Sequence, residues 1–225
     1  MRFRAFALLL AGVALLGACD SGKNYDSDKG DDDYDLAAMA LGQDDLPSGF
    51  QQIPGTEFTG SEWAEVFGSD DPEAKQQQLE AQGWLKNYVT ESVPPRFGKV
   101  LNIRSVSTLY TNEKAAQEST AKFACGLPID TSKPIDEFIV PKIADQSNGF
   151  FVEEAIDEEG TTLMYTTVCF RTGRIVHVVQ EAALPGLEDI GSGLRTARLM
   201  LAHVDDAFDG KERPDEATDD EEEEG

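Results

Sequence analysis

Alternating apolar and polar positions predict five β-strands along this chain. Residues 84–93 and 99–110 are rich in β-branched and aromatic side chains, which suit a pleated, half-buried surface. Three further runs of the same kind follow at 149–156, 162–170 and 174–181. Only short turns separate these last three runs, so we expect an antiparallel meander, because parallel neighbours need a long crossover.

The last hairpin allows a prediction of register. A two-residue loop at Thr172-Gly173 pairs Phe170 with Ile175 across the two strands. One face of the sheet then carries Val168, Phe170, Ile175 and Val179. The other face carries Tyr165, Cys169, Val176 and Val178. Because both faces are apolar, we expect the sheet to be covered on both sides.

Helical periodicity is clearest over residues 192–208. Apolar side chains there recur on a single stripe, which is typical of a helix docked on a sheet. The stripe consists of Leu194, Ala197, Leu201, Val204 and Phe208. Gly191-Ser192 is the predicted cap of this helix.

Shorter helices are predicted at 61–67 and 112–124. A further helix starts at Asp71, with Pro72 in its first turn, and Gly83 ends it. Residues 46–55 are expected to be irregular. This order of elements predicts an α+β fold, in which one domain contains an antiparallel sheet of about five strands flanked by helices.

The first residues have the composition of an export signal. Arg2 and Arg4 precede an apolar stretch over residues 6–16 that contains no charge and no proline. A membrane-spanning helix needs roughly 20 apolar residues, and this stretch is shorter. We therefore expect residues 1–18 to be a signal peptide rather than a permanent membrane span.

The signal ends in the motif Leu16-Gly17-Ala18-Cys19, which resembles the lipobox of bacterial lipoproteins at all four positions. The resemblance implies that Cys19 receives a diacylglycerol group and becomes the first residue of the mature chain. The acyl chains then hold the protein to the membrane, on its extracytoplasmic side. The alternative is an ordinary secretory signal in which Cys19 has no such role.

Acidic residues dominate both ends of the mature chain. The formal net charge is −24, and it becomes −26 without residues 1–18, which carry two arginines and no acid. Residues 19–36 and 211–225 are acidic and poor in apolar side chains, so we expect a disordered tether and a disordered tail. Residues 37–210 remain as the folded domain. The charge excludes nucleic acid as a partner and opposes adsorption to anionic lipid.

Cys125 and Cys169 remain as an even pair once Cys19 is assigned to the anchor. An exported protein keeps such a pair oxidised, so we expect a disulfide between the helix at 112–124 and the strand at 162–170. Cys125 lies on the opposite side of that helix from Phe123, so the bond requires the chain to bend at Gly126. The alternative is two separately buried thiols.

Motifs of catalysis are missing from the sequence. It has two histidines, His177 and His203, and contains no HExxH, GxSxG or P-loop sequence. The acidic run at 26–33 lacks the ligand spacing of an EF-hand calcium loop. We expect no enzyme activity, no cofactor and no metal site.

Large aromatic side chains are the remaining candidates for contact with a partner. They are Trp63, Phe67, Trp84, Phe150 and Phe151. Burial in the core is their usual role, whereas exposure of several in one patch indicates a binding surface.

Two short segments and the order of elements resemble PsbP-like domains and the extracytoplasmic domains of mycobacterial lipoproteins and kinase sensors. The segments are 143–147, before a strand, and 170–176, at a hairpin. The resemblance implies a binding or assembly module rather than an enzyme. We therefore expect a membrane-tethered lipoprotein whose domain binds or assists another envelope component. The alternative is a carrier of a small ligand or lipid, with a cavity between sheet and helix.

Overall fold

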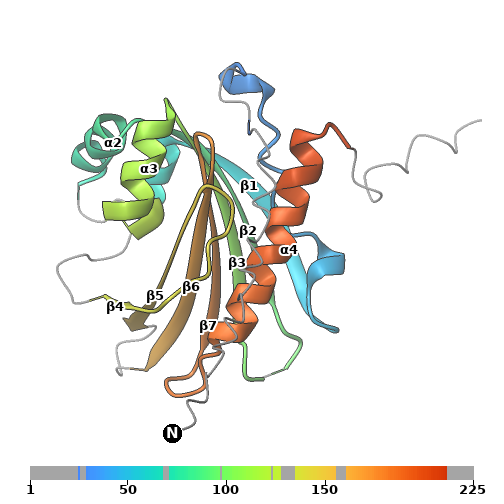
Figure 1. The fold of residues 1–225 in the computed structure, drawn as a ribbon. Helices are drawn as coiled ribbons and strands as arrows, with labels where there is room; N and C mark the ends of the chain where they lie inside the picture. The colour runs from blue at the N-terminus through green and yellow to red at the C-terminus, as the bar shows by residue number, and fades with distance from the viewer. Residues whose placement is uncertain are drawn as a thin grey trace, which may run out of the picture.

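A seven-stranded antiparallel sheet runs through the described part of the chain, with helices on both faces (Figure 1). The computed structural model describes residues 25, 29–67, 71–96, 98–122, 124–127, 135–155 and 161–211. Neighbouring strands follow the order β1-β2-β3-β7-β6-β5-β4. No helix among these residues is long and apolar enough to span a membrane.

The bounds of the elements follow the chain. The strands are β1 (Gln51–Thr59), β2 (Trp84–Val93), β3 (Asn102–Tyr110), β4 (Asp136–Glu137), β5 (Gln146–Ala155), β6 (Thr162–Thr172) and β7 (Ile175–Ala183). The helices are α1 (Gly60–Phe67), α2 (Pro72–Ala81), α3 (Glu113–Lys122) and α4 (Ile190–Phe208). Three single-turn 3₁₀ helices complete the set: η1 (Asp31–Asp33), η2 (Gln43–Asp45) and η3 (Ala124–Gly126).

The α+β fold class is confirmed, and two strands join the five that were predicted. The first half of strand β1, residues 51–55, lies in the region expected to be irregular. Its exposed edge position gives it little apolar alternation, and the register shifts between Ile53 and Thr56. Proline and glycine stand at this bulge, where a central strand would lose a hydrogen bond. Strand β4 has only two residues and closes the other edge.

The predicted register of the β6–β7 hairpin is wrong by two residues. The turn is formed by Gly173 and Arg174, so Thr172 pairs with Ile175. Gly173 has a φ of 55°, which is the left-handed conformation that glycine adopts without strain. A shift of two residues leaves every side chain on its predicted face, because the strand repeat is two residues.

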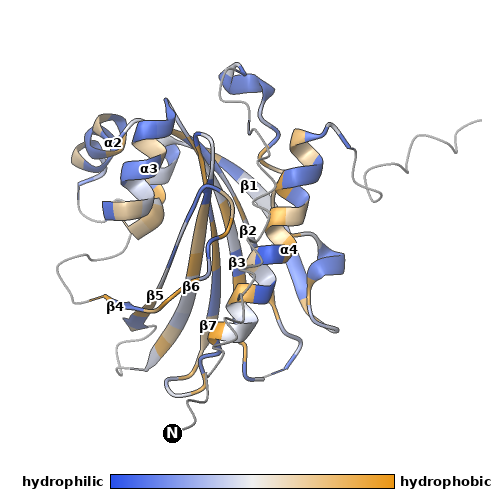
Figure 2. Cartoon of the chain, viewed as in Figure 1, coloured by the Kyte–Doolittle hydropathy of each residue, from blue (hydrophilic) through white to orange (hydrophobic). Residues whose placement is uncertain are grey.

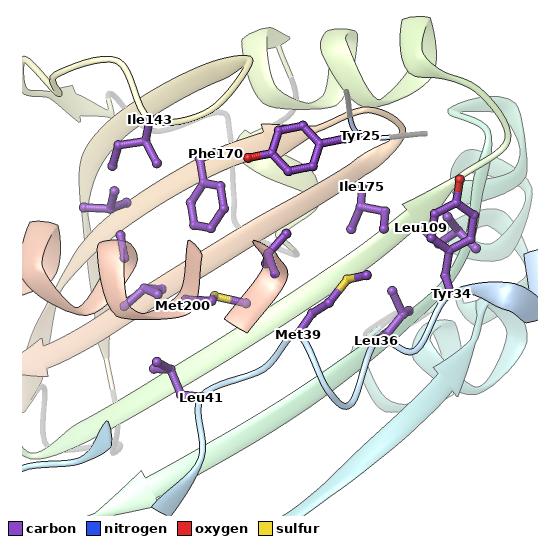
Figure 3. Close-up of a cluster of buried hydrophobic side chains, with 14 of the residues drawn as sticks. Tyr25, Tyr34, Leu36, Met39, Leu41, Leu109, Ile143, Phe170, Ile175 and Met200 are labelled. Carbon is purple, nitrogen blue, oxygen red and sulfur yellow. The ribbon is translucent and has the colours of Figure 1, made fainter. Parts of the chain in front are cut away.

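Helix α4 and the segment at 34–41 cover one face of the sheet (Figure 3). Phe170, Ile175 and Val179 are fully buried beneath them. Figure 3 shows the side chains of Leu36, Met39 and Leu41 pointing to the same sheet surface as Met200 of α4. The predicted stripe on α4 is confirmed in this packing: Ala197 and Val204 are buried, and Leu194, Leu201 and Phe208 are partly buried against the same cluster.

Helices α1, α2 and α3 cover the opposite face of the sheet (Figure 1). Cys169, Val176 and Val178 are buried there, as the alternation predicted. The expectation of a sheet covered on both sides is therefore confirmed.

Aspartates cap two of the helices. The prediction for α2 is confirmed, because Asp71 Oδ1 accepts a hydrogen bond from the Ala74 amide at 2.9 Å. The predicted cap of α4 is wrong by two residues. Asp189 caps this helix, and its Oδ1 accepts from the Ser192 amide at 3.0 Å. A carboxylate at this position also interacts favourably with the positive end of the helix dipole.

Candidate functional site

One end of the sheet holds the N-terminal segment of the chain, and we call it the N-terminal docking site. It consists of the β6–β7 turn (Gly173 and Arg174), Tyr110 at the end of β3, and Asp205 and Phe208 near the end of α4. Tyr25, Lys29, Asp31 and Tyr34 bind to it.

Tyr25 is the first described residue of the chain, and it is only 9% exposed. Its hydroxyl donates to Asp205 Oδ1 at 3.0 Å, and its ring meets the ring of Phe208 edge-on at 5.2 Å. A side chain at Gly173 would lie 2.9 Å from the Tyr25 carbonyl oxygen, so glycine is needed for this close approach. Tyr25 is thus fixed between the β6–β7 turn and α4 (Figure 3).

Arg174 fixes the next stretch of the segment. Its side chain is only 6% exposed. Nη2 donates to the Lys29 carbonyl at 2.7 Å, and Nη1 donates to Asp31 Oδ1 at 2.6 Å. The guanidinium also lies 4.7 Å from the ring centre of Tyr34 and donates to its hydroxyl. Burial lowers the pKa of Arg174, but Tyr34 and Asp31 raise it by more, so the group stays charged.

The structure therefore differs from the disordered tether that was expected over residues 19–36. Tyr34 is 4% exposed and Leu36 is 1% exposed, so the ordered domain begins before residue 37. The turn η1 is hydrophilic (Figure 2), but the residues around it supply aromatic and aliphatic area to bury, and Arg174 balances Asp31. Residues 19–24 and 26–28 lie outside the described residues, as do the signal peptide, Cys19 and all but the first residue of the expected tail.

We expect Arg174→Ala to destabilise the domain by about 3 kcal/mol, because the change leaves buried carbonyl and hydroxyl oxygens without their charged donor. Urea unfolding measures this loss, and limited proteolysis after Lys29 reports release of the segment. Asp31→Asn is the control. Asp31 is 57% exposed, so loss of its charge should cost at most about 1 kcal/mol. Equal stability of Arg174→Ala and the unmutated protein would contradict the role given to Arg174.

The two segments that carried the domain resemblance meet at the same turn. Asp145 Oδ2 accepts a hydrogen bond from the Gly173 amide at 2.7 Å and lies 3.3 Å from Arg171 Nη1. The backbone of Ala144 forms a parallel bridge with Arg171. This contact holds the loop before β5 against the hairpin, so both segments have a structural role at the docking site.

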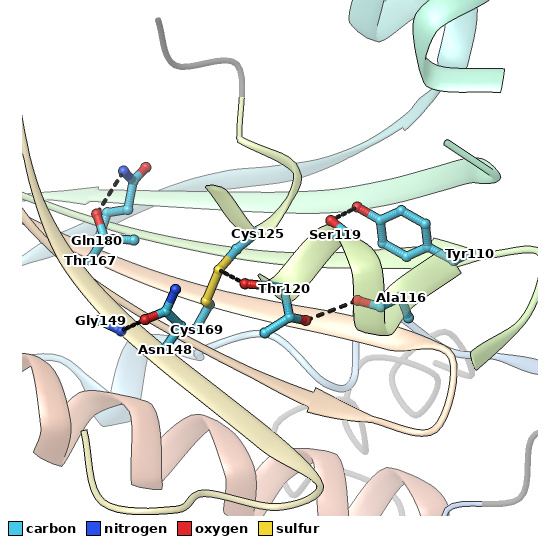
Figure 4. The surroundings of a disulfide bond; sticks show 10 residues. All are labelled: Tyr110, Ala116, Ser119, Thr120, Cys125, Asn148, Gly149, Thr167, Cys169 and Gln180. Atoms are coloured by element: carbon cyan, nitrogen blue, oxygen red, sulfur yellow. Dashed lines mark hydrogen bonds between the residues drawn. A yellow bond between two sulfur atoms is a disulfide. The ribbon is translucent and has the colours of Figure 1, made fainter. Parts of the chain in front are cut away.

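The disulfide between Cys125 and Cys169 is confirmed, and it joins η3 to β6 (Figure 4). Both cysteines are buried, at 1% and 0% exposure, and their Cα atoms are 6.4 Å apart. The bend that the bond requires begins earlier than Gly126. Ala124 and Cys125 already have positive φ values of 47° and 61°, which turn the chain back toward the sheet. Two separately buried thiols are thereby excluded.

The histidines serve packing and hydrogen bonding. His177 is fully buried, and its ring nitrogens lie 2.9 Å from Ser107 Oγ and 2.8 Å from Thr172 Oγ1. Burial lowers its pKa to about 3. His203 Nε2 lies 2.7 Å from Asp45 Oδ2 and links α4 to η2. Neither arrangement places an imidazole in an open cleft.

Most of the candidate contact aromatics belong to the core. Trp63, Trp84 and Phe150 are 3%, 4% and 1% exposed. Phe151 is half-buried, and its ring lies 4.9 Å from the ring of Phe138. Phe67 is 37% exposed at the end of α1. The five side chains therefore form no common exposed patch.

A pocket of about 330 Å³ lies at the β1 edge of the sheet, where the segment at 37–43 and strands β1 and β2 line it. Its polar side chains bind the protein itself. Gln43 Nε2 donates to the Phe50 carbonyl at 2.8 Å, and Gln52 Nε2 donates to the Leu41 carbonyl at 2.7 Å. These bonds join the segment to the sheet edge. The pocket therefore has a mixed polar and apolar lining and lies at the edge of the sheet, whereas the carrier hypothesis required a cavity between sheet and helix.

Among the residues that the structure describes, no three histidine, cysteine, aspartate or glutamate side chains gather as metal ligands would. The acidic run at 26–33 falls partly outside those residues, and its Asp31 is bound to Arg174.

Comparison with known proteins shows a likeness in fold but none in sequence. No protein-family model matches the chain, and no curated protein matches its sequence. Among solved structures, the fold is similar to the crystal structure of the extracellular domain of PknH from Mycobacterium tuberculosis. The TM-score is 0.47 and the sequence identity is 11%, and the match covers 78% of this chain and 95% of that chain.

Proposed function

We propose that this chain is a lipoprotein of the bacterial cell envelope, and that its folded domain binds or assists another envelope component without enzymatic activity. A lipid on Cys19 holds it to the membrane, and the domain lies on the extracytoplasmic side. The observation that carries the proposal is the Leu16-Gly17-Ala18-Cys19 motif, which follows an apolar signal and stands six residues before the docked Tyr25.

The buried disulfide supports export. Disulfides persist in oxidising compartments and are rare where glutathione and thioredoxin keep thiols reduced. The Cys125–Cys169 bond crosses the core between η3 and β6, so the domain is built for the oxidised state.

Three features support a binding role over catalysis or ligand transport. The buried His177 lacks access to a substrate, and the polar groups of the edge pocket already have partners within the protein. Apolar side chains also reach the surface outside the core. Val66 is 60% exposed on α1, and Leu184 and Leu187 are 41% and 45% exposed in the loop between β7 and α4.

We expect Cys19→Ser to release the protein from the membrane, because serine cannot form the thioether that carries the lipid. Membrane fractionation and intact-mass measurement check this result. Ser21→Ala is the control, since it leaves the four motif positions intact. Membrane retention and mass that are the same for Cys19→Ser and the unmutated protein would refute the lipid anchor.

The same cells test the partner. In-cell crosslinking followed by mass spectrometry should recover an envelope component with the anchored protein, and Cys19→Ser should lose it. Failure to recover any envelope component with the anchored, folded protein would argue against a binding role.

A further inference from the structure

The docking of Tyr25 limits the distance between the domain and a lipid on Cys19. Six residue steps separate Cys19 from Tyr25, so a fully extended connection spans about 20 Å. A free tether reaching to residue 36 would span about 60 Å by the same measure. Tyr25 is held by a hydrogen bond to Asp205 and by ring contact with Phe208, so the shorter length applies.

The docked residue also determines which end of the domain faces the anchor. Tyr25 lies against the β6–β7 turn and the C-terminal part of α4. Strand β7 runs from that turn to the opposite end of the sheet, where the β2–β3 and β7–α4 loops lie (Figure 1). Its nine residues place the opposite end about 30 Å farther away.

We propose that the N-terminal docking site is the membrane-facing end of the domain, held within about 20 Å of the lipid headgroups in a defined orientation. This inference rests on the proposed lipid anchor. The surface that this end faces is the bilayer itself. The opposite end, with the exposed Leu184 and Leu187, then points away from the bilayer and is open to other envelope components.

The charge of the docking site favours a small gap between the domain and an anionic bilayer over adsorption of the domain to that bilayer. Acidic side chains outnumber basic ones at this end. The acids are Asp31, Asp32, Asp33, Asp35, Asp205, Asp206 and Asp209, and the bases are Lys29, Arg174 and Lys211. Anionic headgroups repel these groups over a Debye length of about 10 Å at 0.1 M salt. The short connection and this repulsion act in opposite directions, so the domain stands off an anionic surface while keeping its orientation.

Two cysteine variants of the full-length lipidated protein test the orientation. Lys211→Cys places a fluorophore just after α4, at the membrane-facing end, and Lys99→Cys places it in the exposed β2–β3 loop. Each labelled protein is bound to phosphatidylcholine vesicles whose headgroups carry a nitroxide quencher. We expect quenching to be several-fold stronger at position 211 than at position 99. Equal quenching at both positions would overturn the orientation.

Changes to the segment between Cys19 and Tyr25 test whether this short connection causes the orientation. A 12-residue Gly-Ser insertion after Ser21 leaves the domain unchanged and should abolish the difference in quenching between the two positions. Tyr25→Ala should reduce that difference. The matched Tyr25→Phe should preserve it, because the ring contact with Phe208 remains. A difference that survives the insertion unchanged would overturn the role of the short connection.

Failure of the lipid anchor gives a separate result. An unmutated protein that carries no lipid and does not bind the vesicles would overturn the proposed anchor, and the orientation inference would fall with it. Binding with equal quenching at both positions would overturn the orientation alone.

Discussion

A chain in which both Cys125 and Cys169 are replaced by alanine should lose about 4 kcal/mol of its free energy of unfolding. The disulfide closes a loop with a sequence separation of 44 residues, and the cross-link removes that loop's freedom from the unfolded chain. The loss is a large part of the total, since small domains are stable by only about 5–15 kcal/mol. Urea unfolding at neutral pH measures it.

The reduced form of the unmutated protein is the matched control for this double variant. It keeps both buried sulfur atoms, so it separates loss of the cross-link from loss of packing. We expect reduction to produce most of the destabilisation and the alanine changes to add a smaller packing term. Reduced and oxidised proteins that unfold at the same urea concentration would show that the bond contributes nothing to stability.

The sequence predicted the strands that bury side chains on both faces of the sheet. It did not predict the edge strand β1. Strand β2 matches the predicted residues 84–93, because its β-branched and aromatic residues follow the pleat. Most side chains of β1 are exposed, so polar residues, Pro54 and Gly55 are tolerated and the period-two signal disappears. The hydrophobic pattern therefore reports burial, and it identifies a strand only where burial and pleat coincide.

The turn of the β6–β7 hairpin was misplaced because arginine, the residue at position 174, is not a type that is typical of tight turns. Its side chain is buried, and the residues that bury it lie more than 60 positions away, at Asp31, Tyr34 and Tyr110. Local propensity carries no information about such contacts. The face assignment survived because it depends only on alternation along the strand.

The docking site could not be predicted from composition for a related reason. Residues 19–36 have the acidity of a disordered segment, and average charge outweighed three apolar positions. Tyr25, Tyr34 and Leu36 are all buried in the same apolar cluster, where both tyrosine rings meet the ring of Phe208 edge-on. Isolated aromatic residues in an acidic segment were the signal that could have revealed this contact.

Acidification should destabilise the domain through His177 by about 1.4 kcal/mol per pH unit between about pH 6 and pH 3. The imidazole is fully buried, and burial lowers its pKa from 6.5 to about 3. In the unfolded chain the group titrates near its ordinary pKa of about 6.5. Between these two values the unfolded chain binds a proton that the folded protein excludes.

The sign follows from this difference in proton binding. Since the folded pKa lies below the unfolded pKa, the stability is fully present above about pH 6.5 and is lost as the pH falls toward 3. At pH 4.5 the cost is about 2.5 kcal/mol relative to pH 7. Ser107, Thr172 and Phe170 lie against the ring and carry no charge, so none of the three supplies a negative counter-charge for a protonated imidazole.

His177→Gln isolates this effect from the titration of the carboxylates, which both chains share. Glutamine stays neutral at every pH and can still form hydrogen bonds with Ser107 or Thr172. The variant should be less stable at pH 7, because it loses the ring stacked on Phe170. Between pH 7 and 4.5, however, urea unfolding should show it losing about 2.5 kcal/mol less than the unmutated protein. Parallel losses in the two proteins would mean that His177 is protonated in the folded state, and that its burial carries no acid sensitivity.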